Sequence, residues 1–215
     1  MFFLILWLLF FSSGVEAETK IIEDFNRYPV DAFPKWEAYP FQKGKAKSIY
    51  KIKEEAANQY LAALDDKDLS APIFKNFNWD LNQYPYLKFR WRAQKLPPGA
   101  SETSRATNDS ACGVYVGFGS RFSGVAMKYV WSSTAPVGNV WEKDKGKFYI
   151  IVKQAGPASL GKWQHVSINV AEDYQKVFQK QDVKQPFGIS VLTDGNAVHK
   201  AAACDYDDFT ITNSP

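Results

Sequence analysis

Acidic side chains occur in several short clusters, and two carboxylates across the scissile bond are what glycoside hydrolysis requires. Neighbouring residues of a strand point to opposite faces, so adjacent acids do not make a catalytic pair. Asp205 and Asp207 do share a face and could offer oxygen ligands to Ca²⁺, although EF-hand spacing is absent and solvated turn acids are the simpler interpretation. For an enzyme acting on polysaccharide, the candidate acids are Asp109, Asp173 and Asp194.

Nucleophilic catalysis has little support in the sequence. The only histidines are His165 and His199, and no Gly-x-Ser-x-Gly turn stands between a strand and a helix. No His or Cys cluster has the spacing of metal ligands, so neither a metal nor a cofactor is expected. These patterns argue against a serine hydrolase and against a zinc enzyme.

Basic and aromatic residues point to a different chemistry, in which rings stack on sugar faces and polar side chains bond the hydroxyl groups. Arg90, Arg92 and Lys128 fall on the polar faces of apparent strands. The aromatics available to join them are Tyr115, Tyr129, Trp131 and Trp141. On one sheet face these residues would form a polar-aromatic groove. The competing interpretation places most of the seven Trp in the core, where large aromatics usually lie.

The elements that must position these groups are short strands with turn signals between them. Alternation is clearest at 87–92, where Leu87, Phe89 and Trp91 alternate with Lys88 and two arginines. The expected strands are 21–25, 36–41, 47–53, 59–64, 86–93, 111–118, 125–131, 147–153, 163–170, 187–193 and 206–211. One short helix is expected at 171–180, and the first strand is expected to pair with 208–211. The pattern predicts an all-β, single-domain β-sandwich or jelly roll over residues 18–215.

The two cysteines, Cys112 and Cys204, begin apparent strands, and two strands of one sheet would bring them together. Their even number permits a disulfide in an oxidising compartment, whereas two unpaired buried thiols are the alternative.

Residues 1–17 have the layout of a secretory signal peptide. An apolar run covers Phe2 to Phe11, Ser12-Ser13-Gly14 ends it, and small residues flank a cleavage point after Ala17. The run is too short to span a bilayer as a helix. We therefore expect cleavage rather than a membrane anchor, and a periplasmic or secreted bacterial protein. The formal net charge of +3 comes from scattered residues, which argues against nucleic acid as a partner.

The segment from Gly99 to Ser110 is polar and rich in Ser and Thr, and it lies between two expected strands. A mobile connection is the simplest interpretation, although loops often carry function. Asn108-Asp109-Ser110 also matches a glycosylation acceptor, which matters only in a eukaryote.

Several segments together resemble an exported bacterial family catalogued as domain of unknown function 3047. They are Tyr86 to Ala93 with Leu96-Pro97, Asp109 to Val116, Tyr129-Val130-Trp131-Ser132, Trp163, Asp173-Tyr174, Phe178 and Gly188 to Asn196. Three positions depart from the family pattern. Gly113 replaces an Arg, another Arg expected near Ile168 is absent, and the Thr-Asp motif reads Thr193 to Ala197. The resemblance implies no activity, and by analogy a lectin-like or carbohydrate-binding-module-like sandwich.

Three hypotheses follow. The first is a non-catalytic module that binds glycan or another envelope component; the second is a polysaccharide hydrolase or lyase; the third is a structural envelope protein with a protein partner. The predicted ligand-binding residues are Arg90, Arg92, Asp109, Tyr115, Tyr129, Trp131, Asp173, Asp194 and Asn196.

Overall fold

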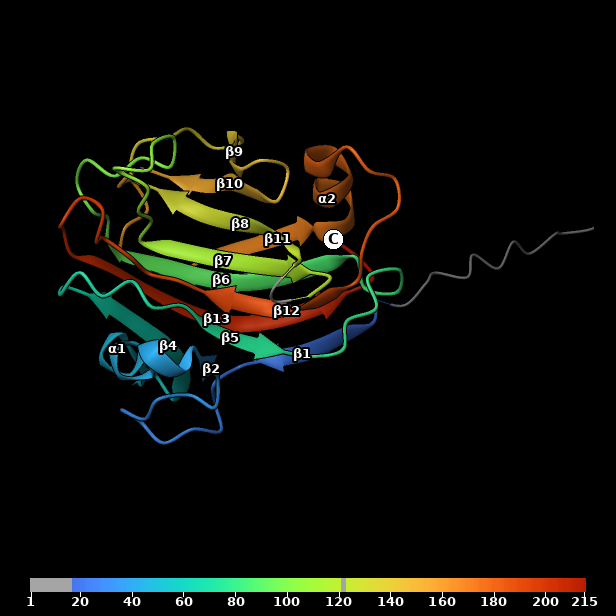
Figure 1. Cartoon of the computed structure of the whole chain (residues 1–215). Coiled ribbons are helices and arrows are strands. Elements are labelled where there is room, and N and C mark those ends of the chain that lie inside the picture. Colours follow the sequence, from blue (N-terminus) through green and yellow to red (C-terminus); the bar gives the residue numbers. More distant parts are fainter. Residues whose placement is uncertain (1–16, 121–122) are drawn as a thin grey trace, which may run out of the picture.

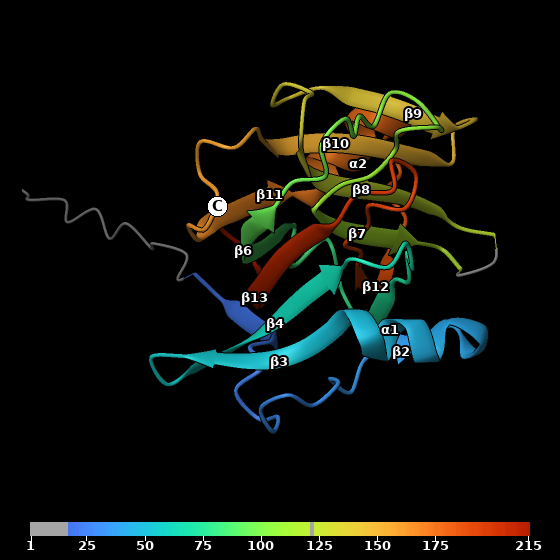
Figure 2. The same ribbon diagram turned by 90° about the vertical axis from the view of Figure 1, so that its left-hand side faces the viewer.

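The computed structural model describes residues 17–120 and 123–215, so the predicted leader lies outside the described residues except for Ala17. The described chain folds into two packed β-sheets, with sheet B in front in Figure 1 and both layers seen from the side in Figure 2. The predicted all-β sandwich is confirmed. Within these residues, no helix has the length and apolarity needed to cross a bilayer.

Sheet A has six strands, ordered β11-β6-β13-β4-β3, with β1 added beside β13. Their bounds are β1 Thr19–Glu23, β3 Tyr50–Glu55, β4 Asn58–Asp65, β6 Tyr86–Lys95, β11 Gln164–Asn169 and β13 Ala202–Thr212. The predicted pairing of the first and last strands is confirmed, because Ile21 lies opposite Thr210 in an antiparallel register.

Sheet B has seven strands, ordered β2-β5-β12-β7-β8-β10-β9. Their bounds are β2 Glu37–Ala38, β5 Ile73–Asn76, β7 Cys112–Phe118, β8 Val125–Ser132, β9 Val140–Asp144, β10 Phe148–Ala155 and β12 Pro186–Val191. The sequence pattern missed β5 and β9, which have only four and five residues. Strands β8 and β10 run parallel to each other.

Helix α2 spans Val170–Phe178, close to the predicted bounds. The side chain of Asn169 accepts a hydrogen bond from the Glu172 backbone amide and so caps its first turn. The pattern missed α1, Lys43–Ile49, which follows the 3-10 turn η1, Pro40–Gln42. The strand expected at 47–53 therefore begins only at Tyr50. The residues before it are helical because Ala46 and Ile49, three residues apart, pack on the core together.

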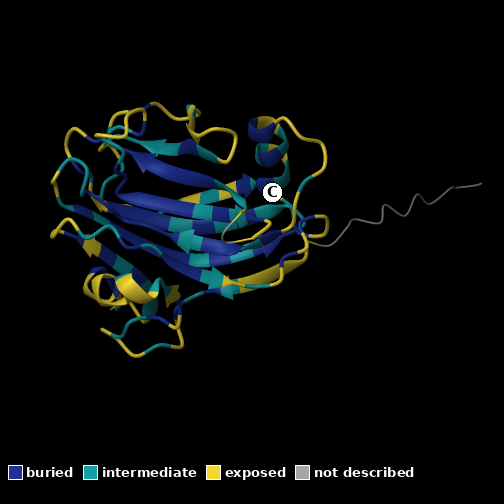
Figure 3. Cartoon of the chain, viewed as in Figure 1, coloured by how far each residue is buried: buried dark blue, intermediate teal, exposed yellow. Residues whose placement is uncertain are grey.

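The core between the sheets is aromatic, and Figure 3 shows the central strands buried. Leu87, Phe89 and Trp91 of β6 face it, as their alternation predicted. In β10, Tyr149 and Ile151 face the main core, while Ile150 and Val152 form a separate cluster on the outer face. Both faces of β10 are apolar, so alternation alone did not distinguish them.

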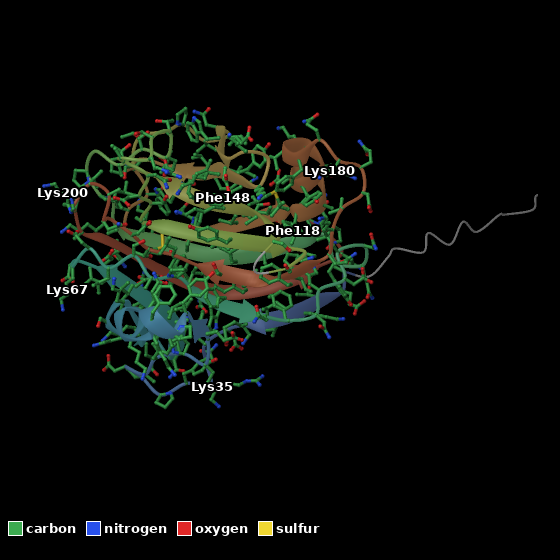
Figure 4. All side chains as sticks on the ribbon, viewed as in Figure 1. Lys35, Lys67, Phe118, Phe148, Lys180 and Lys200 are labelled. Carbon is green, nitrogen blue, oxygen red and sulfur yellow. A yellow bond between two sulfur atoms is a disulfide. The ribbon has the colours of Figure 1, made fainter. Side chains whose placement is uncertain are left out.

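Cys112 of β7 and Cys204 of β13 form a disulfide with a Cα–Cα distance of 5.4 Å. The predicted pairing is present, but the expected arrangement within one sheet is wrong. Both side chains point inward, so the bond joins sheet A to sheet B across the core (Figure 4).

Candidate functional site

The outer face of sheet A carries the predicted arginines, and each lies opposite an aspartate of β13. Arg92 pairs in register with Asp205, and Arg90 with Asp207. Arg92 Nε lies 2.8 Å from Asp205 Oδ2, and Arg90 Nη2 lies 2.6 Å from Asp207 Oδ2. Glu55 forms a further ion pair with Arg92 at 2.8 Å. We call this set, together with Asp208, the arginine ladder.

Two aromatic side chains cover the arginine ladder. Trp163 lies over both guanidinium groups, with its ring centroid 4.7 Å from Arg90 Cζ and 4.5 Å from Arg92 Cζ. Tyr60 meets Trp163 edge to face, at 5.6 Å between centroids. As a result Arg92 is only 8% exposed, although it points away from the core. The chain itself already satisfies these charges, which leaves little of the arginine surface for a ligand.

Asp205 and Asp207, the calcium candidates of the sequence, are the partners of the two arginines on this face. Burial raises the pKa of both carboxyl groups, against the lowering effect of their arginines and amide donors. In the described part of the chain, no group of three or more His, Cys, Asp or Glu side chains converges in a way that would hold a metal ion.

Three of the predicted site residues do not lie on an outer face. Tyr129 and Trp131 of β8 are fully buried between the sheets. Asp173 of α2 accepts a hydrogen bond from Lys153 Nζ at 3.1 Å and lies beside Tyr129. The expectation that these aromatics share a surface with the arginines is therefore wrong. In β8 the outward positions belong to Lys128 and Val130, and the large aromatics alternate with them.

The outer face of sheet B carries a different arrangement, centred on Tyr115. Cross-strand registers place Phe74 of β5, Ser190 of β12, Tyr115 of β7 and Lys128 of β8 in one row across the sheet. With adjacent strands about 4.8 Å apart, the two aromatic residues stand about 10 Å apart, on either side of Ser190.

The neighbouring row across sheet B consists of small residues, namely Gly188, Gly117 and Ala126. Because they lack bulk, this part of the face forms a groove of about 240 Å³. The ring of Phe187 lies against Gly117, where a Cβ would stand 2.3 Å from the ring.

Aromatic side chains form the walls of this groove, which we call the aromatic groove. Tyr39 and Phe74 meet edge to face at 4.9 Å between centroids. Tyr115 stacks on Phe148 at 5.8 Å and an interplanar angle of 10°, and Phe148 is labelled in Figure 4. No charged side chain of the described residues lines the groove.

A buried charge cluster adjoins Tyr115 towards the end of the sandwich opposite α2. Lys128 is 2% exposed, and its Nζ lies 3.8 Å from Asp194 Oδ1 and 3.3 Å from Ser110 Oγ. Ser110 Oγ donates to Glu102 Oε1 at 3.2 Å. Burial by itself lowers the pKa of Lys128, but Tyr115, Asp194 and Glu102 raise it, and the net shift is upward. Burial raises the pKa of Asp194 despite Lys128.

The absence of a side chain at Gly113 makes room for Lys128. A Cβ at this position would lie 2.6 Å from Lys128 Cε. Without a side chain at Gly113, the Lys128 side chain of β8 fits against β7 and brings its positive charge to this place.

The segment 99–110 is anchored at several points, contrary to the simple picture of a mobile connection. Glu102, Asp109 and Ser110 are all buried. Ser132 Oγ donates to Glu102 Oε2 at 2.6 Å, and the Val198 amide donates to Asp109 Oδ2 at 2.9 Å. Thus Asp109 and Asp194 are brought near each other, as the coupling of their charges indicates. Asn196 lies half-buried in the same loop as Asp194.

Sequence reasoning missed the residues that complete both faces. Phe74 lies in β5, which is too short for a periodic signal. Phe187 and Tyr39 lie within the expected strands at 187–193 and 36–41, but the pattern of those strands gave no sign of a groove. Trp163 was noted only at the start of a strand, and Glu102 only as part of a polar loop. The one available signal was local: Gly117 and Gly188 in apolar strands indicate a close approach of other groups.

Comparison with known proteins gives a family and a distant structural likeness. A family model described as protein of unknown function DUF3047 matches residues 34–210. None of the curated proteins matches the sequence. Among solved structures, a family 11 carbohydrate-binding module of the cellulosomal cellulase Lic26A-Cel5E of Clostridium thermocellum is 10% identical, with 90% of this chain and 94% of that chain covered and a TM-score of 0.44.

Two further structures show a similar level of likeness. A family 29 carbohydrate-binding module from Piromyces equi is 8% identical, with 93% of both chains covered and a TM-score of 0.37. The module TmCBM61, in complex with β-1,4-galactotriose, is 11% identical, with 87% of this chain and 97% of that chain covered and a TM-score of 0.40. Scores at this level describe a distant resemblance and say nothing about ligands.

Proposed function

The chain belongs to the family of proteins of unknown function DUF3047, and we propose that this member is a non-catalytic, glycan-binding β-sandwich of the cell envelope. The observation that carries the proposal is the aromatic groove on the outer face of sheet B. Sugar rings present apolar C–H faces that stack on aromatic side chains, and their hydroxyl groups require only a few placed polar partners. Ser190 and the hydroxyl group of Tyr39 supply such partners along the groove, whereas Tyr115 contributes its ring because its hydroxyl group is directed to Lys128.

Tyr115 is the member of the predicted ligand-binding set that lines this groove. We assign Asp109, Asp194 and Asn196 a structural role in the loops beside the groove. The two aspartates accept hydrogen bonds from backbone amides of the loops around Lys128. Arg90 and Arg92 belong to the ladder on the opposite face.

Export is part of the proposal. A buried disulfide between the two sheets fits an oxidising compartment such as the periplasm or the cell exterior. The leader-like segment at 1–17 favours the same compartment.

A matched pair of substitutions tests the groove. Ser190→Tyr adds a bulky side chain in the middle of the groove, whereas Ser167→Tyr makes the same change on β11 at the exposed outer face of sheet A. Tyrosine suits strand positions, so both variants should fold. On a glycan array, we expect the purified protein to bind, and Ser190→Tyr to weaken binding roughly tenfold or more, equivalent to about 1.4 kcal/mol.

Ser167→Tyr should bind as the unmodified protein does. If no glycan binds, or if the two variants lose binding equally, the groove is not a glycan site.

A polysaccharide-acting enzyme is the second candidate, and the raised pKa of Asp194 near Glu102 and Asp109 is what favours it. These carboxylates are at most 6% exposed and are held by Ser110, Ser132 and the Val198 amide, so they have poor access to a substrate. Assaying the same glycans for newly formed reducing or unsaturated ends distinguishes the two, since release of such ends would favour the enzyme.

A further inference from the structure

A second hollow lies at the end of the sandwich where α2 stands, and its lining adjoins that of the aromatic groove along the chain. Phe187 lines the groove, and the two residues before it, Gln185 and Pro186, line this second hollow. The hollow consists of two adjoining parts of about 500 and 590 Å³, which share Asn82 and Gln185. In Figure 1 the end of β5 and the start of β12 lie at this same end, in agreement with their antiparallel pairing.

Carboxamide side chains are the distinctive feature of this second hollow, which we call the amide cleft. Asn78 and Asn82 are exposed, and their side chains have no hydrogen-bond partner among the described residues. Gln185 Oε1 accepts from the Leu81 amide at 2.8 Å, which orients the side chain and leaves its NH₂ group free to donate. Gln175 Nε2 donates to the Gln181 carbonyl at 3.2 Å and leaves its own oxygen available.

A carboxamide presents a donor and an acceptor close together, which suits the adjacent hydroxyl groups of a sugar. An aromatic ring stands beside these amides. Phe77 is half-buried and stacks on the buried Trp79, with 5.6 Å between centroids and an angle of 16°. The other face of a ring fixed in this way is suited to a sugar. The cleft therefore repeats, with more polar groups, the combination found in the aromatic groove.

The charge of the two hollows selects among glycans. Among the described lining residues, Asp80 and Asp182 are the charged side chains of the amide cleft, and no Lys or Arg lines either the cleft or the groove. A uronic acid, phosphate or sulfate group would meet the negative charge of Asp80 and Asp182 there, with no cation among the lining residues. Neutral sugars meet no such penalty.

We infer, building on the glycan-binding function proposed above, that the ligand is a neutral polysaccharide chain that lies along the aromatic groove and continues past Phe187 into the amide cleft. The cleft then adds affinity only when the oligosaccharide is long enough to reach it. A terminal monosaccharide or a short oligosaccharide uses the groove alone.

The first part of the test compares neutral with acidic polymers on the intact protein. The panel contains β-1,4-glucan, β-1,4-galactan, xylan and mannan against polygalacturonate and alginate. We expect retention by at least one neutral polymer and by neither acidic one. Binding to acidic polymers alone would overturn this inference and leave the glycan-binding function intact, whereas binding to none of the panel would overturn both.

The second part uses oligosaccharides of increasing length from the polymer that binds, with the double variant Asn78→Ala/Asn82→Ala. Asn139→Ala, in the connection between β8 and β9, is the control for loss of a carboxamide elsewhere. The double variant should lower affinity for the longest oligosaccharide roughly tenfold and leave that for the disaccharide unchanged. No effect at any length, while Ser190→Tyr still weakens binding, would place the ligand in the groove alone. Equal effects at all lengths would overturn the inference that only long oligosaccharides reach the amide cleft.

Discussion

The outer face of sheet A places guanidinium groups against carboxylates of the next strand, whereas the outer face of sheet B places aromatic rings around glycine and alanine. In the arginine ladder, Arg90 and Arg92 each bond to an acid of β13 and lie under Trp163. In the aromatic groove, Phe187 rests on Gly117 and the centre remains hollow. A face rich in charge can thus be closed by its own partners, while a face of small and aromatic residues offers a surface to a ligand.

Charged side chains also stabilise both faces, and the two sets of charges differ in how deeply they are buried. The Lys128 cluster beside the groove is more deeply buried than the ladder, since Lys128 is 2% exposed and Glu102 4%. Removing one member of a buried ion pair leaves the other without compensation, and this loss costs more than an exposed pair contributes. The cluster and the ladder should therefore differ in how strongly a single substitution acts.

The largest effect is expected at Lys128. Lys128→Met keeps the length of the side chain but leaves Asp194 buried without its cation, so the free energy of unfolding should fall by about 3–5 kcal/mol. Chemical unfolding measures the change. Lys145→Met, at an exposed lysine in the turn between β9 and β10, should change it by less than about 0.5 kcal/mol. Similar losses for the two lysines would mean that the cluster does not depend on Lys128.

A smaller loss of stability is expected in the arginine ladder, with no loss of binding. Arg92→Ala leaves Asp205 with Gln94 as its remaining side-chain donor and removes contacts to Trp163, for a cost of about 1–3 kcal/mol. Lys88→Ala, on the same outward side of β6, is the matched control. Glycan affinity should be the same for both variants and the unmodified protein. Loss of glycan binding by Arg92→Ala, at a temperature where the variant is folded, would indicate that the ligand binds on the outer face of sheet A instead.

The smallest effect is the pH dependence contributed by Asp205. Its pKa in the folded protein is raised above the ordinary 3.8, chiefly by burial, so the folded state binds the proton more tightly than the unfolded state. The stability that this group contributes is present below pH 3.8 and is lost as the pH rises through the folded value. Asp205→Asn removes this dependence.

The difference in unfolding free energy, unmodified minus Asp205→Asn, should therefore decrease as the pH rises from below 3.8 towards neutrality. Unfolding curves recorded across this range give the sign. An increase with pH would mean that the ion pair with Arg92 lowers the pKa of Asp205 more than burial raises it. The charged ladder would then stabilise the folded state.

Local sequence patterns were reliable where one strand alone decided the outcome. Alternation at 87–92 correctly gave which side chains face the core, and the helix expected at 171–180 agrees with α2 within two residues at each end. They failed where two strands or loops decide together. Tyr129 and Trp131 looked available for binding, but they face inward in β8. The sequence did not identify Phe74 and Phe187 as groove residues, because the groove forms only where they meet Ser190 and Gly117 of neighbouring strands.

The sequence by itself determined a sheet protein, the direction in which most side chains point and the presence of two cysteines able to pair, because the pleat of a strand and the chemistry of a thiol are local properties. Only the tertiary structure decided that the disulfide crosses the core, that the arginines meet aspartates, and that the groove lies on the other sheet. These outcomes depend on strand order and register, which bring together residues far apart in the chain, such as Arg92 and Asp205. Which outer face stays open for a ligand is therefore a property of the neighbours of each strand.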